Sequence, residues 1–336
     1  MKKPLLLFGT GIIAMMLLLE VVFRLLPVST ATRSGYYIHP AILTYPAHHC
    51  FTAATGWDLK NAQKNCTNNL GFLADRDFVL DPQAIALIGD SFVEANMLPA
   101  PERLAAQLEI RLKGRPVYAL GGPGSSLLDY AERAKFAAEK LGTRTFVFVL
   151  ERGDVKQAIC GSGNIHGLCI DAKTLLLRVE TQPPPNDVKR LIRRSALAQY
   201  VFSQLKFDIS KILPKPSQPR GGSNDMQLDG LSVSPPVSKI IKYFFKEISA
   251  IENAQFLFLI DADRTHVSDT STNESGDLKL LKAEANAMHA IFIDPTAVFR
   301  SLFNDSGMIL EVGPYDHHWN GNTVQILADL ISKRLP

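Results

Sequence analysis

Short apolar runs alternate with predicted helical stretches over most of the chain. Five of the runs have the length and composition of buried strands: 84–88, 116–120, 145–150, 255–260 and 290–293. Four other segments are predicted to be helices: 102–112, 127–141, 237–251 and 322–333. Because strands that alternate with helices form βαβ units around a parallel sheet, the pattern predicts an α/β fold.

The alternation stops in the middle of the chain. Residues 187–212 are predicted to form a basic helix that carries Arg190, Arg193 and Arg194. These side chains most simply form a solvated face, and the alternative is that they meet anionic glycan or lipid headgroups. The segment 214–236 is rich in Pro, Gly and Ser, which is typical of a linker or surface loop. We interpret residues 155–236 as an insertion that either covers the active-site edge of the sheet or is a solvated excursion without function.

The N-terminus carries a long apolar segment. Residues Pro4 to Leu19 have no charge and follow two lysines. Sixteen helical residues span about 24 Å, which is less than the roughly 30 Å hydrocarbon core of a bilayer. An extension to Val28 reaches far enough but includes Glu20 and Arg24, whose i, i+4 spacing allows them to pair near the outer interface.

This segment predicts a single membrane anchor. The lysines before it favour a cytoplasmic N-terminus, with the rest of the chain on the other side of the membrane. A cleaved signal peptide is the alternative, which the weak cleavage pattern around residues 29–31 disfavours. We therefore expect an anchor at 1–28, a loop-rich lead-in at 29–80, and an α/β domain at 81–336 that contains the insertion.

Composition and charge exclude several classes of protein. The chain of 336 residues has 36 Lys+Arg against 33 Asp+Glu, and a net charge of +3 gives no basic patch for nucleic acid. Hydrophobic residues make up 46%, so neither global disorder nor a protein with many membrane spans fits. The composition therefore indicates an ordinary folded domain joined to one apolar segment.

Four cysteines indicate an oxidising compartment. Proximity favours the pairs Cys50 with Cys66 and Cys160 with Cys169, although four cysteines allow three pairings and could also be unrelated buried thiols. Two histidines precede Cys50, but no second ligand pair completes a zinc pattern. We expect disulfides, no metal and no cofactor.

Three short motifs carry possible chemistry. Ser91 follows a predicted buried strand in Gly-Asp-Ser, so its hydroxyl should lie at the carboxyl end of the sheet, where open α/β folds bind ligands. The second strand ends in a Gly-Gly-Pro-Gly loop that begins at Gly121 and permits close backbone approach. Asp316, His317 and His318 precede the last helix, where a carboxylate can orient an imidazole that accepts a serine proton.

These motifs together resemble the SGNH/GDSL hydrolase superfamily over roughly residues 69–336. The resemblance implies a flavodoxin-like three-layer α/β/α sandwich with a parallel sheet. It also implies that Ser91 is the nucleophile, His318 the general base and Asp316 its orienting acid. The backbone N–H groups of Ser91 and Gly121 would form the oxyanion hole.

The chain departs from the family pattern at two places. The Asn of the third motif block is replaced by Gly153, so that oxyanion donor is lost or is supplied by another residue such as Arg152 or Asn164. The loss of one such donor typically costs about 100- to 1000-fold in rate. The usual Asp-x-x-His spacing would also place Trp319 at the base position, so we expect His318 to serve, with His317 as a possible substitute.

The resemblance predicts a serine-dependent esterase without a cofactor, single-pass in the bacterial inner membrane, with its catalytic domain in the periplasm or outside the cell. The expected substrate is an acylated carbohydrate or small ester. The Asp-x-His-Trp form resembles alginate-type O-acetyltransferases, which raises the alternatives of glycan acetyl transfer and of a membrane-bound polysaccharide-modification partner. The missing Asn raises a third alternative, a catalytically impaired polysaccharide-binding or scaffold protein. A metal-dependent hydrolase using Asp316, His317 and His318 lacks further ligands.

Overall fold

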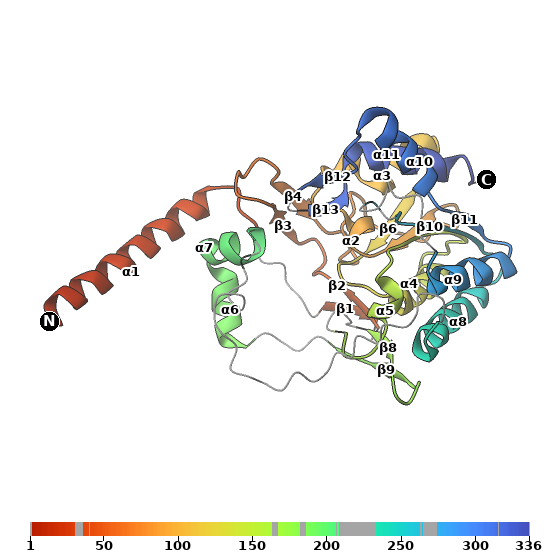
Figure 1. Ribbon diagram of the computed structural model, residues 1–336, viewed down its shortest axis with the longest axis horizontal. Helices are drawn as coiled ribbons and strands as arrows, with labels where there is room; N and C mark the ends of the chain where they lie inside the picture. The colour runs from red at the N-terminus through yellow and green to blue at the C-terminus, as the bar shows by residue number, and fades with distance from the viewer. Residues whose placement is uncertain are drawn as a thin grey trace. The chain divides into compact units, whose positions relative to one another are not determined.

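The structure is a computed structural model of the chain (Figure 1). It describes residues 2–30, 36–39, 41–162, 167–181, 186–205, 207, 233–262, 264, 274–314 and 316–335. The chain divides into two compact units. The first unit comprises Met1–Arg33, Cys50–Asn65 and Pro184–Ser223, and the second comprises Ser34–His49, Cys66–Pro183 and Asn224–Pro336.

The second unit is built on a parallel sheet of five strands. These strands are β5 (Ile85–Gly89), β6 (Val117–Gly121), β7 (Thr145–Leu150), β10 (Gln255–Ile260) and β11 (Ile291–Ile293). Their order in the sheet is β11-β10-β7-β5-β6, and each neighbouring pair is parallel. In sequence order this is the flavodoxin-like arrangement 2-1-3-4-5, so the predicted sheet is confirmed.

Both faces of the sheet are covered, because successive side chains along each strand enter opposite cores. Ala86 and Ile88 of β5 lie in one core, whereas Ile85 and Leu87 lie in the other. Helices α4 (Leu127–Lys140), α8 (Pro235–Ser249) and α9 (Gly276–Ala287) cover the first face. Helices α3 (Leu104–Arg111), α10 (Thr296–Ser306) and α11 (Gly321–Ser332) cover the second (Figure 1). The expected three-layer α/β/α sandwich is confirmed.

Two helices of the sandwich were absent from the sequence-based expectation. Helix α9 buries only Leu281 and Ala285, and α10 buries only Phe299. So few buried positions give a weak helical period, which explains why the pattern of apolar residues did not reveal them. The predicted helix at 102–112 instead begins with a 3₁₀ turn, η1 (Ala100–Glu102), and continues as α3.

Short antiparallel strand pairs accompany the main sheet. They are β1 (Tyr36–His39) with β2 (Ile42–Thr44), β3 (Cys50–Ala53) with β4 (Gln63–Cys66), β8 (Leu168–Ile170) with β9 (Leu177–Val179), and β12 (Glu311–Gly313) with β13 (Asp316–Trp319). The lead-in predicted as loop-rich therefore contains two of these pairs. The segment before the last helix is a strand rather than a loop.

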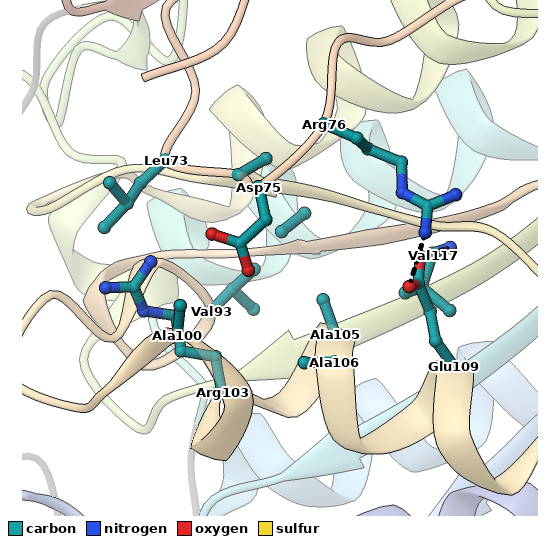
Figure 2. A pocket seen from close by; sticks show the side chains of 12 residues that line it. Leu73, Asp75, Arg76, Val93, Ala100, Arg103, Ala105, Ala106, Glu109 and Val117 are labelled. Carbon is teal, nitrogen blue, oxygen red and sulfur yellow. Dashed lines mark hydrogen bonds and ion pairs between the residues drawn. The ribbon is translucent and has the colours of Figure 1, made fainter. Parts of the chain in front are cut away.

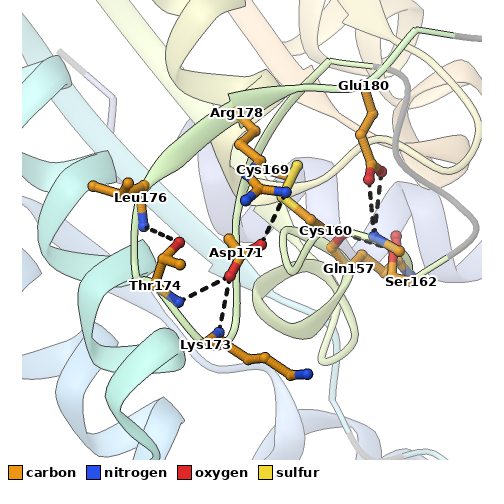
Figure 3. Close-up of a disulfide and its surroundings, with 11 residues drawn as sticks. Gln157, Cys160, Ser162, Cys169, Asp171, Lys173, Thr174, Leu176, Arg178 and Glu180 are labelled. Carbon is orange, nitrogen blue, oxygen red and sulfur yellow. Dashed lines mark hydrogen bonds and ion pairs between the residues drawn. A yellow bond between two sulfur atoms is a disulfide. The ribbon is translucent and has the colours of Figure 1, made fainter.

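The cysteines are oxidised. Cys160 and Cys169 form a disulfide that joins the chain after α5 (Asp154–Gln157) to β8, as predicted (Figure 3). Backbone hydrogen bonds flank it, from Cys160 N to Ile170 O at 3.0 Å and from Ile170 N to Ala158 O at 2.9 Å. Cys50 and Cys66 are also disulfide-bonded, and none of the four cysteines is free.

The first unit contains the N-terminal helix α1 (Lys2–Leu25). Its portion Leu6–Leu25 is apolar and long enough to cross a membrane, and none of it is buried in the protein. The predicted basic helix is present as α6 (Asp187–Arg194), followed by α7 (Ala196–Ala198) and the π-helical segment η2 (Gln199–Gln204). The rest of that predicted helix, 208–212, and most of the expected loop, 214–232, lie outside the described residues.

Candidate active site

Ser91 lies at the carboxyl edge of the sheet, next to the point where the strand order reverses. It begins the short helix α2 (Ser91–Glu94) directly after β5, all of whose residues are buried. The Asp90 side chain caps this helix by accepting a hydrogen bond from the Phe92 N–H at 2.9 Å. Asp90 therefore fixes the turn that presents Ser91.

His318 contacts Ser91 although the two residues are 227 positions apart. His318 Nε2 lies 2.7 Å from Ser91 Oγ, and His318 Nδ1 lies 2.5 Å from Asp316 Oδ1. The Asp316 side chain is 5% exposed, whereas that of His318 is 26% exposed. The structure thus brings the predicted nucleophile, base and orienting acid together in a continuous chain of contacts.

The direction of these contacts follows from the chemistry of the groups. A buried carboxylate accepts a hydrogen bond from His318 Nδ1–H, which leaves the lone pair of Nε2 directed at the Ser91 hydroxyl. Asp316 Oδ1 also accepts a hydrogen bond from the backbone N–H of His318 at 3.1 Å. The carboxylate therefore holds both the backbone and the imidazole ring of His318. This arrangement can withdraw the proton of Ser91 as its oxygen attacks an electrophile.

Aromatic rings hold the imidazole of His318. The Phe92 ring lies 4.8 Å from the His318 ring and 4.7 Å from the Trp319 ring, measured between centroids. Trp319 is 1% exposed, and its Nε1–H donates to Asp261 Oδ1 at 2.7 Å. The strand β13 is therefore tied to the end of β10 through one buried hydrogen bond.

Arg264 extends this connection. Its guanidinium donates to both carboxylate oxygens of Asp261, at 3.2 and 2.9 Å, and to Glu311 Oε1 at 3.0 Å. It also donates to the carbonyl oxygen of His317 and lies 5.3 Å above the Phe92 ring. Asp261 and Arg264 therefore brace the hairpin that carries Asp316 and His318, a role that their sequence positions did not suggest.

His317 is directed away from Ser91. Its Nδ1 lies 2.8 Å from Glu311 Oε2, and its side chain is 76% exposed. Neighbouring residues of a strand point to opposite faces, so only one of the two histidines can face Ser91. The prediction that His317 could substitute for His318 is not supported by this geometry.

The third motif block has no side chain at the position of the usual Asn. Gly153 occupies the Asn position, and its N–H donates to Glu151 Oε2 at 2.5 Å. A Cβ atom on Gly153 would lie 2.6 Å from the same carboxylate oxygen, so Glu151 fills the space beside this position. Of the two candidate replacement donors, Arg152 is exposed and Asn164 lies outside the described residues.

Gly121 ends β6 and faces α2 closely. A Cβ atom at this position would lie 2.5 Å from the backbone nitrogen of Glu94, so the close packing of α2 on β6 requires glycine here. The next residue, Gly122, donates its N–H to Asp90 O at 3.2 Å. The first and second motif blocks are thus joined directly, while the oxyanion role of Gly121 remains a prediction.

A buried arginine supports the turn that presents Ser91. Arg133 of α4 is 2% exposed and donates to Gly89 O at 2.7 Å, Leu120 O at 3.2 Å and Ser125 Oγ at 2.5 Å. It therefore holds the ends of β5 and β6 together. In the sequence it lies in an amphipathic helix among charged residues, and only its burial reveals the role.

Several acidic side chains near the turn that presents Ser91 are buried. Burial raises the pKa of Asp90, and the nearby His318 and the Phe92 N–H oppose this effect only in part. Burial likewise raises the pKa of Asp154, with the charge of Asp90 adding to the shift. Burial also raises the pKa of Glu94 to about 7, although its carboxylate accepts hydrogen bonds from Asn96 and Tyr45.

A separate cavity lies beside the edge strand β6. It has a volume of about 200 Å³ and is bounded by α3 and the segment 73–76 (Figure 2). Arg76 and Glu109 form an ion pair of 2.8 Å at this cavity. Ser91, His318 and Asp316, all of them described, do not line it.

One group of side chains among the described residues has the spacing of metal ligands. It consists of Cys160, Cys169 and Glu180, which are labelled in Figure 3. The two sulfur atoms are joined in the disulfide, and Glu180 accepts hydrogen bonds from the Gly161 N–H at 3.1 and 3.3 Å. These contacts account for the group as part of the hairpin.

No family model and no curated protein sequence matches the chain. Among solved structures, it is similar to a lipolytic protein of the G-D-S-L family from Veillonella parvula, with 12% identity, a TM-score of 0.40, and coverage of 75% of this chain and 99% of that one. It is also similar to the acetyl xylan esterase AlAXEase, with 13% identity, a TM-score of 0.40, and coverage of 75% and 100%. A carbohydrate esterase family 2 enzyme from Corynascus (Myceliophthora fergusii) has 12% identity, a TM-score of 0.36, and coverage of 80% and 70%.

These likenesses are too distant to carry an argument about chemistry, so the function rests on the residues of this chain. Its own topology gives the fold plainly. The parallel sheet has the order 2-1-3-4-5, with Ser91 after the first strand of the sheet and Asp316 and His318 before the last helix. The second unit therefore has the SGNH/GDSL-hydrolase-like fold that the motifs predicted.

Proposed function

We propose that the protein is a serine esterase that cleaves O-acyl groups. The observation that carries this proposal is the contact chain from Ser91 Oγ through His318 to Asp316, with distances of 2.7 and 2.5 Å. Chemistry at a serine needs a base within hydrogen-bond reach of the hydroxyl and a third group that orients the base. The site supplies both at the carboxyl edge of the sheet, where α/β folds of this kind bind their ligands.

In the proposed mechanism, Ser91 Oγ attacks the carbonyl carbon of the ester while its proton passes to His318 Nε2. Asp316 stabilises the resulting imidazolium, and the N–H groups of Ser91 and Gly121 hold the negatively charged oxygen. The imidazolium then gives its proton to the leaving alcohol, and an acyl-serine remains. Water, deprotonated by His318, attacks the acyl-serine, which releases the carboxylic acid and restores Ser91.

We place the substrate outside the cytoplasmic membrane, where it would be an acylated carbohydrate or a small ester. The apolar helix α1 and the oxidised cysteines support this location. The Asp-x-His-Trp form, shared by resemblance with exopolysaccharide O-acetyltransferases, supports a glycan as the carrier of the acyl group. No cofactor enters this mechanism.

The same resemblance favours one second function, acetyl transfer to a glycan. In that reaction a sugar hydroxyl replaces water in the attack on the acyl-serine, and all other steps are unchanged. A membrane-bound polysaccharide-modification partner would then supply the acyl group or the glycan. The position of the usual Asn donor is occupied by the carboxylate of Glu151, which cannot donate a hydrogen bond to an oxyanion. This observation favours a different function, in which an impaired site binds polysaccharide without cleaving an ester.

The primary experiment measures ester cleavage by the full chain in detergent. Ser91→Ala is compared with Ser306→Ala, which removes an exposed hydroxyl on α10 that bonds only locally to Leu302 O. We expect Ser91→Ala to lose hydrolysis of a chromogenic acetyl ester and labelling by a fluorophosphonate, and Ser306→Ala to keep both. Full retention of both by Ser91→Ala would refute the mechanism.

A second experiment identifies the acceptor. The wild-type chain is incubated with the chromogenic ester in the presence and absence of oligosaccharides that carry free hydroxyl groups. Release of acetate at an unchanged rate supports the esterase, whereas acetylated sugar formed at the expense of acetate supports the transferase. Binding of oligosaccharide without any turnover by the wild-type chain would support the impaired site.

A further inference from the structure

A glutamate within the apolar helix α1 accepts hydrogen bonds from a segment 175 residues away. Glu20 Oε2 accepts from Ser195 Oγ at 2.7 Å and from the Leu197 N–H at 3.1 Å. Its other oxygen accepts from the Ala196 N–H at 3.0 Å. A carboxylate inside a membrane-spanning helix is costly unless it is satisfied in this way, so these contacts explain why Glu20 is tolerated.

Further contacts fasten the same two segments together. Arg24 Nε pairs with Glu20 Oε1 at 2.7 Å, as the i, i+4 spacing predicted, and Arg24 Nη2 donates to Arg194 O at 3.3 Å. The rings of Phe23 and Tyr200 stack with centroids 4.3 Å apart. Figure 1 shows α7 beside the C-terminal end of α1, with α6 directly before it in the chain. The C-terminal end of α6 is therefore held beside the last turns of α1.

The surface of α6 is divided into an apolar and a basic part. Val188, Leu191 and Ile192 have the i, i+3, i+4 spacing of one helix face and are 66%, 71% and 42% exposed. The basic residues of the helix lie outside this stripe: Lys189, Arg190, Arg193 and Arg194. No residue of α6 is buried, so within the described part of the chain its apolar face is not covered by a core.

The position of Glu20 along α1 sets the depth of this attachment. The membrane-length portion of α1 ends at Leu25, five residues after Glu20. At 1.5 Å per residue, Glu20 lies about 7.5 Å inside that end. Helices that lie in a membrane interface bury their apolar face by about 5–10 Å, which is the same depth.

We propose that α6 is an interfacial membrane-binding helix. Val188, Leu191 and Ile192 enter the boundary between acyl chains and headgroups in the outer leaflet of the membrane that α1 crosses, and the neighbouring Lys and Arg side chains bind the phosphates of anionic lipids. The occupant of the apolar face is thus the bilayer itself. This inference rests on the proposed membrane anchor and is independent of the proposed esterase activity.

The test uses the full chain in nanodiscs that contain phosphatidylglycerol and phosphatidylcholine. Because all four native cysteines are disulfide-bonded, a spin label can be attached to one introduced cysteine. The labelled variants are Leu191→Cys on α6, Leu17→Cys on α1, and Ile309→Cys at a residue of the second unit that is 72% exposed. Collision rates with oxygen, which dissolves in lipid, and with a water-soluble nickel chelate report the depth of each label.

We expect the label at 17 to lie deep in the bilayer, the label at 191 to lie just inside the phosphate plane, and the label at 309 to be in water. A label at 191 as accessible to nickel as the label at 309 would overturn the inference if the label at 17 is deep. A label at 17 in water would instead refute the anchor, and the inference with it. Acetyl ester hydrolysis, assayed on the same samples, reports separately on the proposed function.

The lipid chemistry is tested by charge removal. Lys189→Gln/Arg194→Gln in the Leu191→Cys background should reduce the ratio of inserted to exposed label about fivefold per lost charge in phosphatidylglycerol nanodiscs, whereas Arg190 is left in place because it already pairs with Asp187 at 2.5 Å. Lys173→Gln, at an exposed position of the second unit, is the matched control and should leave the ratio unchanged. An equal ratio in pure phosphatidylcholine and in phosphatidylglycerol would contradict the binding of anionic headgroups.

Discussion

Two carboxylates organise long-range contacts in this protein, one in each unit. Asp316 orients His318 toward Ser91, which is 227 residues from His318, and Glu20 receives three hydrogen bonds from residues 195–197. The first contact lies on the edge of a five-stranded sheet with a large core on both faces. The second joins an exposed apolar helix to a short helical segment outside any sheet.

These two sets of contacts show two ways in which a fold holds a polar side chain in place. At the edge that carries Ser91, the strand register, the Asp90 cap and the buried Arg133 hold the backbone in place independently of the contacts among the site side chains. In the first unit, the hydrogen bonds to Glu20 are themselves a principal link between the two segments. We therefore expect changes at the site to affect chemistry more than folding, and changes at Glu20 to affect local order more than chemistry.

The largest expected effect compares two adjacent histidines. His318→Ala removes the base and should lower kcat/KM for an acetyl ester by at least about 10⁴-fold, because the loss of a catalytic triad member has effects of this size. His317→Ala removes an exposed ring that contacts Glu311 and should change kcat/KM less than about threefold. Steady-state kinetics on both variants would contradict the assignment if the two losses were equal or reversed.

A smaller effect is expected from the brace behind the catalytic hairpin. Asp261→Asn weakens the bonds to Trp319 and Arg264 and should reduce kcat by about 10- to 100-fold with little change in KM, because a small misplacement of His318 is costly. Trp319→Phe loses the hydrogen bond to Asp261 and some buried volume but leaves the ion pair of Asp261 with Arg264 intact, so its loss of kcat should be smaller. If Asp261→Asn raised KM alone, a positioning role would be wrong.

The corresponding change in the first unit is Glu20→Gln. The amide cannot accept as strongly from Ser195, Ala196 and Leu197, so these part-buried hydrogen bonds become weaker. Amide hydrogen exchange at 195–197 in nanodiscs should therefore become faster, while hydrolysis of a soluble ester stays unchanged. If Glu20→Gln left amide hydrogen exchange at 195–197 unchanged and abolished ester hydrolysis, the proposed difference between the two units would be wrong.

The last prediction concerns the free energy of unfolding of the second unit and its dependence on pH. Burial raises the pKa of Glu94 to about 7 from its ordinary value of 4.5. Between these two pH values the folded chain keeps the proton on Glu94, whereas the unfolded chain has lost it. The stabilising contribution is complete below about pH 4.5 and falls by about 1.4 kcal/mol per pH unit until it is lost above pH 7.

Thermal unfolding between pH 5 and pH 8 measures this contribution. Glu94→Gln cannot ionise and should flatten the decrease in Tm with rising pH relative to the wild-type chain. Parallel curves for the two proteins would show that Glu94 does not titrate in this range. Burial also raises the pKa of Asp129, to about 6, so some decrease of Tm with rising pH should remain in both proteins.

The sequence predicted the parts of the molecule that have a strong local signal. The five strands are nearly continuous apolar runs, and Ser91, Asp316 and His318 follow from motif position together with the rule that parallel strands share one carboxyl edge. The exclusion of His317 required the strand β13, which no apolar pattern indicated.

Long-range polar contacts could not be predicted from the sequence in the same way. The partner of Glu20 lies 175 residues away, and nothing in the local sequence around either segment specifies the other. Arg133 and Asp261 are polar residues whose burial depends on tertiary packing. The basic residues around Arg190 indicated a solvated face, with anionic glycan or lipid headgroups as the alternative. Local patterns determine elements and their order, whereas the partners of buried charges are determined by the assembled fold.

The central claim is that Ser91 forms an acyl intermediate with the aid of His318. The direct measurement is mass spectrometry of the full chain, quenched by acid during turnover of an acetyl ester and then digested. The account predicts one added acetyl group on the peptide that contains Ser91, which is absent from Ser91→Ala and strongly reduced in His318→Ala. Rapid turnover of the ester with no acetyl group on Ser91, or with the acetyl group on another residue, would contradict it.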